Sequence, residues 1–599
     1  MGRQNSGVAR ESDRRPNSRS VDELRRELAR ARPLCRAWIE TVPASRRDTM
    51  AAKFARHALE AFAARIDADI VLSAAPIAPA RRLDRAAERL AVTIGADAVD
   101  LPLAEGLHFV TGLYPLLLTA NNRSALGAFY TPPCLTARLL DQAEEQGVDW
   151  TQARVLDPAA GAGAFLIGTA LRIREALKGA EPAFVLRQMG VRLLGLEIDP
   201  HAAALAQAAM EIVLADLAKA AKLPVPNFVR VCDTLAEKPN GSFDLVIGNP
   251  PYGRVALTPA QRTEFRRGLF GHANLYGVFT DIAVRWAKAG GLIAYLTPTS
   301  FLAGQYYSAL RRLLAQEAPP IAVDFVHARK GVFEDVLQET LLAVYRKGAT
   351  ASRAQVHYLH VASECDAHVT RNGTIGLPAD PADPWLAPRS PEHAELIRHV
   401  EGMSARLADW GYSVSTGPLV WNRFKAQLRD RAGKDTRPLV WAESVTADGR
   451  FLFRALKKNH APFFKMERRD DWLLVDRPCV LVQRTTAKEQ ARRLIAAELP
   501  ADFVTDHGGV VVENHLNMVR AHGDAAVPPT VVAALLNSDV LDQVFRCMNG
   551  SVAVSAFELE ALPLPDASAL APLAAMLADG AAADTVQAEC DRLYGRGTA

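Results

Sequence analysis

The sequence predicts an α/β protein with a doubly wound, mostly parallel sheet at its centre. From about residue 153, short apolar runs alternate with longer segments of helical periodicity, which is the pattern of strand–helix–strand units. A glycine-rich turn follows the first of these strands and opens a helix, as expected where an open α/β sheet binds its ligand. The chain has 599 residues, more than one hydrophobic core usually serves, so further domains are expected on either side.

The expected elements follow the chain in order. The region before residue 120 is predicted to be helical, with helices at 22–31 and 51–66 and breaks at Pro33, Pro43 and Pro76. In the central region we expect strands at 154–156, 191–196, 228–231, 243–247, 291–296 and 322–326, and helices at 164–178, 200–218 and 278–287. The C-terminal half mixes strands at 478–483 and 509–512 with helices at 487–499 and 567–594.

These patterns divide the chain into five parts. Residues 1–20 are expected to form a disordered basic tail, because they are rich in Arg and Ser and carry no apolar core. A basic arm lying near phosphates is the alternative for this tail. The N-terminal helical region (21–120), the central α/β domain (121–350), a mixed α/β domain (375–565) and a C-terminal helical tail (566–599) follow.

Composition excludes some classes of protein. The net charge is only +3, so composition alone does not indicate a nucleic-acid binder. The sequence has no apolar run of ~18 residues and no secretory signal, which argues against a membrane protein. None of the seven cysteines forms a Cys-x-x-Cys pair, so we expect no metal site and a reducing, cytoplasmic location.

The first candidate site is the turn at 157–163, which has the sequence Asp-Pro-Ala-Ala-Gly-Ala-Gly. Glycine lets a backbone approach a ligand closely, where a side chain would clash. A carboxylate suits a cationic ligand better than a phosphate, so Asp157 favours the α-amino group or sulfonium of S-adenosylmethionine over a dinucleotide. Any α/β protein can have a similar turn. The candidate cofactor-binding residues in it are Asp157, Ala159, Gly161 and Gly163.

Three further residues extend the expected cofactor site. Glu197, at the end of the second strand, stands where an acidic residue binds two ribose hydroxyls; a surface charge is the alternative. Asp233 follows the third strand and is a candidate acceptor for the adenine amino group of the cofactor, or a plain turn residue. Thr131, in the segment 129–133, would close over the methionine end; a simple Pro-Pro turn is the alternative.

A second turn carries the expected chemistry. The apolar strand at 243–247 runs into Asn249-Pro250-Pro251-Tyr252, which we expect at the same sheet edge as the first turn, opening onto one cavity with it. The N6 of adenine is a poor nucleophile, because its lone pair is delocalised into the ring. The Asn249 side-chain oxygen and the Pro250 carbonyl would each accept a hydrogen bond from one N–H group of this amine and draw the nitrogen toward a tetrahedral shape. Positioning and desolvation would supply most of the acceleration.

The rest of this turn would shape a pocket for the target base. Pro251 stiffens the turn, and Tyr252 presents an aromatic face for stacking. A base inside a duplex must be flipped out to reach such a pocket, and Phe333, after the strand at 322–326, is the candidate second wall. A rigid capping turn and a core phenylalanine are the alternatives. Asn249 is also a candidate contact to the cofactor, and Pro251 to the substrate.

In this order, the segments 129–133 and 157–163, Glu197, Asp233 and the Asn249 turn resemble the amino-methyltransferases of restriction–modification systems. The closest resemblance is to the gamma class, which includes the TaqI and Eco57I modification enzymes, and it covers about residues 121–347. It implies a Rossmann-like class I domain that uses S-adenosylmethionine to methylate N6 of a flipped adenine in double-stranded DNA. It also implies that Asn249, Pro250 and Tyr252 hold the adenine and that Phe333 packs on its other face.

The C-terminal half resembles the family's target-recognition region, on segments 416–423, 482–486, 513–517 and 549–565. Arg423, Lys425 and Arg484 are candidate DNA contacts, although each could be an ordinary surface charge. The N-terminal helical region shows no nuclease motif, so we expect modification without cleavage, with a separate restriction endonuclease or specificity subunit as a further partner. The alternatives are methylation of RNA adenine, protein glutamine or N4 of cytosine, and a non-catalytic DNA-binding subunit of a defence complex.

Overall fold

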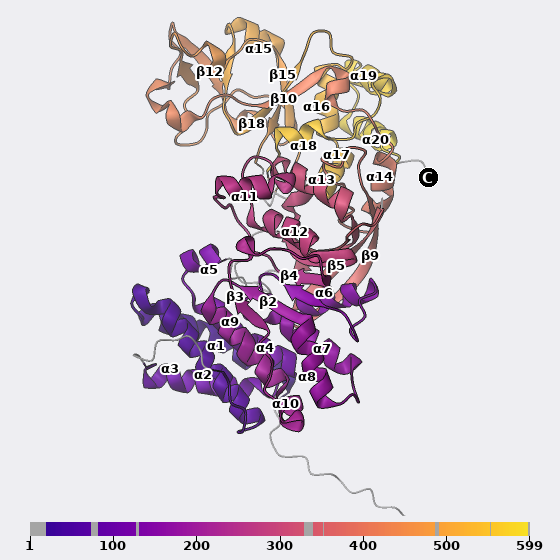
Figure 1. The fold of residues 1–599 in the computed structure, drawn as a ribbon. Coiled ribbons are helices and arrows are strands. Elements are labelled where there is room, and N and C mark those ends of the chain that lie inside the picture. Colours follow the sequence, from indigo (N-terminus) through magenta and orange to yellow (C-terminus); the bar gives the residue numbers. More distant parts are fainter. Residues whose placement is uncertain are drawn as a thin grey trace, which may run out of the picture. The chain divides into compact units, whose positions relative to one another are not determined.

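The computed structural model describes residues 20–73, 82–126, 131–328, 339–350, 353–485, 490, 492–550 and 553–596 (Figure 1). The chain forms two compact units. The first comprises Met1–Thr136 and Trp150–Glu237, and the second comprises Ala137–Asp149 and Lys238–Ala599.

The first unit begins with the helices that the sequence predicts, namely α1 (Val21–Thr41), α2 (Arg47–Ile66), α3 (Arg85–Ala98), α4 (Leu103–Leu117) and α5 (Ala120–Leu126). The expected break at Pro33 is wrong, because α1 continues through this residue. Proline removes one helical hydrogen bond. Leu24 and Leu28 before it and Cys35 and Ile39 after it are all buried, so packing of one apolar face outweighs that loss.

These helices pack against the α/β part of the same unit. Helix α2 contacts α3 and α4, and also α9 (Pro200–Val213). The crossing of α2 and α3 is close, since a Cβ added at Gly95 would lie 1.9 Å from the carbonyl oxygen of Ala58. Only glycine fits there. The contacts of α2 and α4 with α9 join the N-terminal helical region to the α/β part of this unit.

In the first unit, three parallel sheet strands are neighbours in the order β3 (Val229–Val231), β2 (Leu193–Glu197) and β1 (Val155–Asp157). Helix α7 (Ala164–Ala176) follows β1 as expected, and a second helix that the sequence analysis did not predict, α8 (Pro182–Arg192), precedes β2. The helix expected at 200–218 is bent by 60° between α9 and α10 (Ala215–Ala221). Because the strands are parallel, their carboxyl ends share one edge.

In the second unit, six sheet strands are neighbours in the order β4-β5-β7-β6-β8-β9. They are β4 (Phe243–Gly248), β5 (Ala287–Pro298), β6 (Pro320–Ala328), β7 (Thr340–Arg346), β8 (Arg353–Ser363) and β9 (Asp366–Gly376). Strands β4 and β5 are parallel as expected, but β7 is antiparallel to both its neighbours and β9 is antiparallel to β8. This sheet is therefore mixed beyond β5. Its helices are α11 (Pro259–Glu264), α12 (Leu275–Trp286) and α13 (Ser308–Glu317), and α6 (Pro133–Glu145) spans the boundary between the units.

The rest of the second unit carries two smaller sheets. One has the order β10-β18-β15-β16 and the other β11-β13-β12-β17-β14. Their strands are β10 (Tyr412–Thr416), β11 (Leu428–Arg429), β12 (Thr436–Val440), β13 (Phe463–Lys465), β14 (Leu474–Val475), β15 (Cys479–Gln483), β16 (Ala496–Leu499), β17 (Val510–Val512) and β18 (Leu516–Ala521). The helices here are α14 (His393–Val400), α15 (Ala501–Asp506), α16 (Pro529–Leu536), α17 (Asp539–Met548), α18 (Ala556–Glu560), α19 (Ala571–Ala578) and α20 (Ala583–Leu593).

The helix expected at 487–499 is wrong where the structure describes it. Residues 496–499 form β16, which pairs antiparallel with β15 from Cys479↔Leu499 to Val482↔Ala496. Leu494, Ile495, Ala496, Ala497 and Leu499 are all buried. Sheet pairing stabilises this short buried segment more than the helix preference of its alanines would, so tertiary contacts override the local preference.

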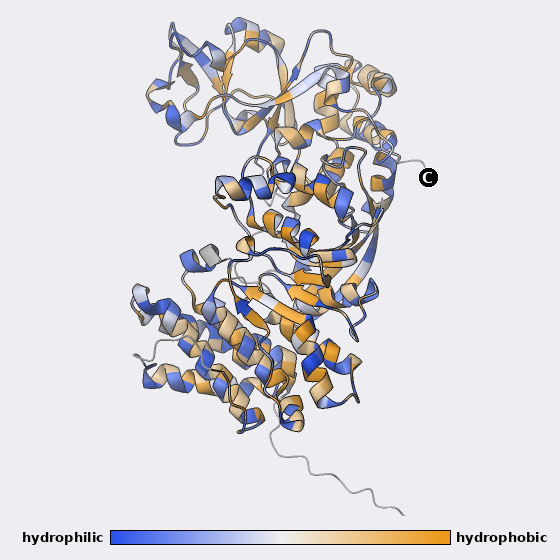
Figure 2. Ribbon diagram, in the orientation of Figure 1, coloured by the Kyte–Doolittle hydropathy of each residue, from blue (hydrophilic) through white to orange (hydrophobic). Residues whose placement is uncertain are grey.

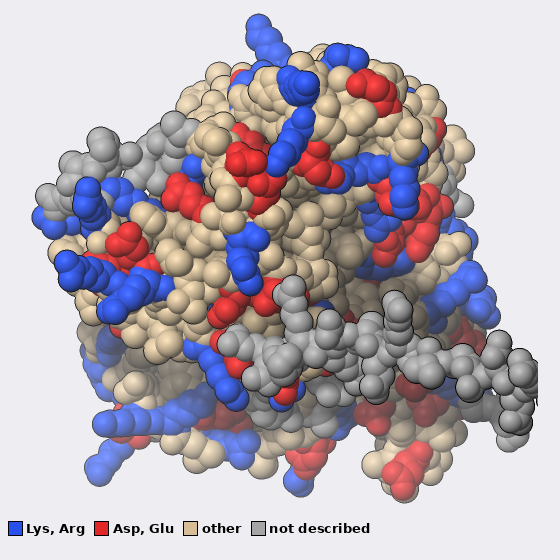
Figure 3. Space-filling view, turned by 90° about the horizontal axis from the view of Figure 1, so that it is seen from below, with Lys and Arg blue, Asp and Glu red and all other residues tan. Residues whose placement is uncertain are grey.

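Hydrophobic residues concentrate in strands β4 and β5 of the second unit (Figure 2). On the face seen in Figure 3, basic and acidic side chains are interspersed, in keeping with the small net charge. All seven cysteines are free. Among the described residues no single helix is long and apolar enough to cross a membrane, and only the bent pair α9–α10 reaches that length and composition.

Candidate functional site

The glycine-rich turn lies between β1 and α7 in the first unit, where the sequence predicts it. Gly161 and Gly163 have φ of 53° and 91°, in the left-handed region that favours glycine. A Cβ at Gly163 would lie 3.0 Å from the Cβ of Ala206 in α9, whereas a Cβ at Gly161 would meet nothing within 4 Å. Gly163 therefore serves helix packing, while Gly161 leaves open space above the turn.

Asp157 ends β1 and is 1% exposed. Its Oδ1 accepts a hydrogen bond from the backbone N–H of Ala159 at 3.0 Å, while its buried Oδ2 has no hydrogen-bond partner among the described residues. Burial raises the pKa of this carboxyl to about 8. A buried carboxylate oxygen without a partner is costly unless a ligand satisfies it, so this geometry fits a cationic group.

Glu197 ends β2, the neighbouring strand, and is also buried. Its Oε2 accepts from the backbone N–H of Gly161 at 2.7 Å, and its Oε1 accepts from that of Asp199 at 2.9 Å. Burial raises the pKa of Glu197, and the two backbone donors oppose that shift. A carboxylate has about four lone-pair positions, so both oxygens can still accept hydroxyl groups from a ligand.

Two exposed apolar side chains lie beside these carboxylates, and no sequence motif indicates them. Ile198, directly after Glu197, is 55% exposed, and Val231, at the end of β3, is 53% exposed. Glu197 and Val231 are paired in the sheet register, so both apolar residues lie at the carboxyl edge of the strands. Apolar residues exposed at the end of buried strands are a sign of a ligand site. Two such residues suit the two faces of a flat ring in a ligand.

The positions of the other expected cofactor residues give less support for a role in cofactor binding. Asp233 is exposed and its Oδ1 accepts from the backbone N–H of Leu235, so it caps the short 3-10 helix Thr234–Ala236. Thr131 is buried immediately before α6. Phe129 and Tyr130, from the same predicted turn, lie outside the described residues.

The N-terminal helical region supports the cofactor turn. The Tyr114 hydroxyl of α4 donates to Oδ2 of Asp199 at 2.5 Å, and Oδ1 of Asp199 accepts from the backbone N–H of His201 at 2.9 Å. Burial and the neighbouring carboxylate raise the pKa of Tyr114. Asp199 thus caps α9 directly after Glu197, held by a residue that no local pattern marked.

The second predicted turn lies in the second unit, at the carboxyl end of β4. Asn249 and Tyr252 are partly buried and Pro250 is buried. The Tyr252 hydroxyl lies 2.7 Å from Oδ1 of Asn249 and 3.1 Å from the carbonyl oxygen of Leu296 in β5. Burial raises the pKa of Tyr252, so the hydroxyl remains a donor. It therefore orients the Asn249 amide, a role that the sequence analysis did not assign to Tyr252.

The turn is fixed from its far side by the start of α12. The backbone N–H of Leu275 donates to the carbonyl of Gly253 at 2.9 Å, and Arg254 forms a β-bridge with Asn274. Asn274 also caps α12 through the backbone N–H of Tyr276. The start of α12 therefore holds the Asn249 turn in place.

Tyr252 lies at one end of a row of aromatic rings. Its ring meets Tyr276 edge to face at 6.2 Å between centroids, and Tyr276 stacks on Tyr307 at 5.1 Å. Pro251, the expected substrate contact, is partly exposed beside them. Phe333, the expected second wall, lies outside the described residues. Its role, and the meeting of the Asn249 turn with the cofactor turn of the other unit, stay predictions.

The three candidate DNA contacts lie in the C-terminal part of the second unit. Arg423 and Lys425 are exposed on short 3-10 turns, and the Lys425 ammonium lies over the Trp421 ring at 5.5 Å. Arg484 differs, because its Nη1 donates to the backbone carbonyl of Asn514 at 2.7 Å and so supports the turn between β17 and β18. In the described part of the chain, no group of His, Cys, Asp and Glu side chains is arranged to hold a metal ion.

Comparison with known proteins adds to this geometry. Residues 193–333 match the family model described as Eco57I restriction-modification methylase. The Type II methyltransferase M.BsuBI of Bacillus subtilis is 26% identical over 481 residues, which cover 77% of this chain and 91% of that protein. M.PstI of Providencia stuartii, also a Type II methyltransferase, is 27% identical over 357 residues, covering 57% of this chain and 68% of that protein.

The fold is shared with a solved structure, the Type IIL restriction-modification enzyme MmeI in complex with DNA. The two superpose with a TM-score of 0.57 over 97% of this chain and 95% of that one, at 12% sequence identity. The predicted fold class, a Rossmann-like α/β domain with further regions on either side, is confirmed by this shared fold. The resemblance drawn from the motifs is confirmed as well: the chain is similar to the restriction-modification methyltransferases of the Eco57I type.

Proposed function

We propose that this chain is a DNA methyltransferase that transfers a methyl group from S-adenosylmethionine to N6 of an adenine flipped out of double-stranded DNA. It would serve as the modification component of a restriction–modification or phage-defence system. The observation that carries the proposal is the Asn249 amide, held at the carboxyl end of β4 by the Tyr252 hydroxyl. An oriented carboxamide oxygen is what an exocyclic amine requires as an acceptor.

The residues of the first unit fit the cofactor. Oδ2 of Asp157 is buried without a partner and would meet the ammonium or the sulfonium charge. Glu197 would accept the two ribose hydroxyls, Ile198 and Val231 would enclose the adenine ring, and Asp233 would accept from its amino group. Gly161 leaves the space that such a ligand needs. Bound S-adenosylmethionine supplies an activated methyl group, and its use here rests on this fit and on the class I fold.

The second unit would prepare the target amine. Oδ1 of Asn249 and the carbonyl of Pro250 would each accept a hydrogen bond from one N–H group of the target amine. These two hydrogen bonds would pull the nitrogen out of conjugation and expose its lone pair. The anchors at Gly253 and Arg254 keep these acceptors fixed before the base arrives, so no reorganisation is needed during the reaction. The reaction requires this turn and the cofactor turn to face one cavity.

Double-stranded DNA as the substrate is supported by the similar proteins. MmeI, which shares the fold, was solved in complex with DNA, and M.BsuBI and M.PstI are Type II methyltransferases. The proposed chain would flip the target base, since a stacked adenine cannot reach Asn249. A separate restriction endonuclease would complete the proposed system.

The test is an assay of purified protein with methyl-labelled S-adenosylmethionine and three kinds of substrate: duplex DNA, RNA and protein. We expect label in duplex DNA only, and N6-methyladenine as the modified nucleoside in mass spectrometry. Label in N4-methylcytosine, RNA or protein glutamine would replace the proposed target with that one. The absence of any transfer would favour a non-catalytic DNA-binding subunit.

The matched variant is Asn249→Ala. It should abolish methylation and leave S-adenosylmethionine binding, measured by calorimetry, within about twofold of the wild type, because all the candidate cofactor residues except Asn249 itself belong to the other unit. Unchanged turnover in this variant would remove Asn249 from the mechanism.

A further inference from the structure

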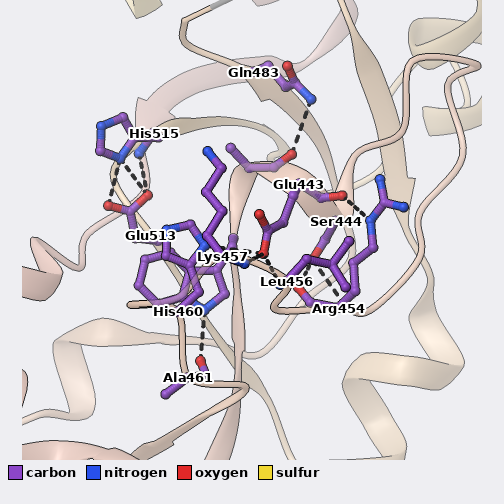
Figure 4. A network of polar contacts seen from close by, with 12 residues as sticks. Glu443, Ser444, Arg454, Leu456, Lys457, His460, Ala461, Gln483, Glu513 and His515 are labelled. Atoms are coloured by element: carbon purple, nitrogen blue, oxygen red, sulfur yellow. Dashed lines mark hydrogen bonds and ion pairs between the residues drawn. The ribbon is translucent and has the colours of Figure 1, made fainter.

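The turn between β17 and β18 presents a histidine on a buried carboxylate. Glu513 is 0% exposed, and the Nδ1 of His515 lies 2.8 Å from both of its carboxylate oxygens. The His515 side chain is 58% exposed. A carboxylate only accepts hydrogen bonds, so Nδ1 carries a hydrogen and Nε2 is the ring nitrogen that faces outward. Figure 4 shows this pair at the edge of the polar network.

The backbone of this turn is held rigidly. The N–H of Glu513 donates to the carbonyl of Val440 at 3.0 Å, and that of Asn514 donates to Leu419 at 2.9 Å. The strand segments approach so closely that a Cβ at Gly417 would lie 2.3 Å from the carbonyl oxygen of Glu513. The turn is therefore fixed on the side of residues 417–419.

Arg484 holds the other side of the turn. Its backbone N–H donates to the carbonyl of His515 at 2.9 Å, and its Nη1 donates to that of Asn514 at 2.7 Å. The N–H of His515 in turn donates to Oε2 of Glu513 at 2.8 Å. These hydrogen bonds thus fix the backbone of the turn and the tautomer and direction of the His515 ring, although the ring itself is solvent-exposed.

A second carboxylate–histidine pair nearby shows what a purely structural pair looks like. Oε1 of Glu443 lies 3.2 Å from Nδ1 of His460, and this imidazole stacks on Trp441 at 3.7 Å. Both side chains of that pair are mostly buried, at 11% and 16% exposure. Glu443 also accepts from the backbone N–H groups of Leu456 and Lys457, so it ties down a loop (Figure 4). The pair formed by Glu513 differs because its imidazole is presented to solvent.

The surroundings of His515 suit a nucleic acid. Leu419, which binds the turn, leads into the segment that carries the exposed cations Arg423 and Lys425. Contacts to phosphates position a protein without regard to sequence, whereas sequence is distinguished by rigidly placed hydrogen-bonding groups at base edges. His515 is exposed, and its ring is oriented by Glu513, so it has the properties of such a group.

We propose that His515 reads a base edge of the DNA target through Nε2, and that Glu513 is the positioning residue that fixes its ring. This proposal rests on the proposed function, since it names a residue that sets the sequence specificity of the methyltransferase. His515 would distinguish bases at one position of the recognition site, while Arg423 and Lys425 would contribute to affinity at every sequence.

The test begins with the wild-type protein expressed in a host that lacks other DNA methyltransferases. Single-molecule sequencing of the host DNA gives the methylated site, and duplexes that differ from it by one base pair then give relative kcat/KM values. His515→Ala should reduce discrimination at one position by on the order of tenfold and leave the other positions unchanged. His507→Ala, at an exposed histidine after α15, is the matched control and should change nothing.

Glu513→Gln tests the positioning role. It should weaken discrimination at the same position as His515→Ala. Glu443→Gln should lower the unfolding temperature through its loop and leave the ranking of the duplexes unaltered.

The results separate the two proposals. If the wild type methylates no DNA, the proposed function fails. If it methylates a defined site and His515→Ala preserves the ranking of all duplexes, the role of His515 is overturned, whether or not overall activity falls. If His515→Ala is too inactive for the duplexes to be ranked by kcat/KM, the same duplexes are ranked by competition binding to His515→Ala and to the wild type. An unchanged ranking would then overturn the role of His515.

Discussion

The burial of Asp157 makes cofactor binding depend on pH. Its carboxyl has a pKa of about 8 in the free protein, against an ordinary value of 3.8, because the side chain is desolvated. At pH 7 only about one carboxyl in ten is then ionised, and at pH 6 about one in a hundred. If the cationic cofactor binds the ionised form, the apparent Kd is the intrinsic Kd divided by that fraction. The affinity for S-adenosylmethionine should therefore rise about tenfold from pH 6 to pH 7 and level off above pH 8.

The assay is calorimetric titration with S-adenosylmethionine in the absence of DNA, between pH 6 and pH 7.5. Asp157→Asn keeps an oxygen for the N–H of Ala159 but cannot ionise. It should bind more weakly than the wild type at pH 7.5 and lose the slope. Asp233→Asn, at an exposed carboxylate, is the control and should keep the slope.

The sign of the effect is fixed by the direction of the pKa shift. A raised carboxyl pKa means that the free protein holds a proton which a cation must displace, so binding improves as pH rises. Histidines ionise in the same pH range. For this reason, only the part of the pH dependence of affinity that Asp157→Asn removes is attributed to Asp157. A wild-type Kd that is constant between pH 6 and 7.5, or a slope that survives in Asp157→Asn, would refute the assignment of Asp157 to the cationic group.

Three further predictions follow from the site and its surroundings. Tyr252→Phe keeps the ring but loses the hydroxyl that orients Asn249, so kcat should fall about tenfold with little change in the KM for DNA, measured by steady-state methylation. Gly163→Ala should destabilise the protein by about 1–2 kcal/mol in thermal unfolding, because it forces a left-handed backbone and crowds a helix, and Gly161→Ala, which meets no neighbour, should cost less. Arg423→Ala should reduce the slope of log binding constant against log salt by about one, with no change in sequence preference.

The cofactor half could be predicted from sequence because its signals are local. Asp157, Gly161 and Gly163 fall within seven residues, and Glu197 ends a short apolar run that the alternation of strands and helices predicts to be a strand. Strands that are parallel and buried place such ends at one edge, so position along the chain nearly determines position in space for β1 to β3. What remained hidden was the partner of Asp199, since Tyr114 lies 85 residues away in a helix with no distinctive motif.

The C-terminal half was less predictable for the same reason. Its strands are short and pair with segments far along the chain, such as Leu439 of β12 with Val511 of β17. No local pattern specifies such a partner, and the run at 494–499 has the composition of a helix but the burial of a strand. The motif at 513–517 was noticed as a resemblance, yet the burial of Glu513 beneath an exposed His515 could be seen only in three dimensions.

Tyr252 combines a role that the sequence indicated with one that depends on the fold. One hydroxyl hydrogen has two acceptors in reach, Oδ1 of Asn249 at 2.7 Å and the carbonyl of Leu296 at 3.1 Å, and can satisfy one at a time. In the proposed reaction, when Oδ1 accepts a hydrogen of the target amine, the Tyr252 hydroxyl can turn to Leu296 by rotating about its C–O bond. The ring need not move, so stacking of the base on Tyr252 is independent of where its hydrogen points. Loss of the hydroxyl should therefore disorder the Asn249 amide before the base arrives without weakening the stack, which is why Tyr252→Phe should lower kcat and spare KM.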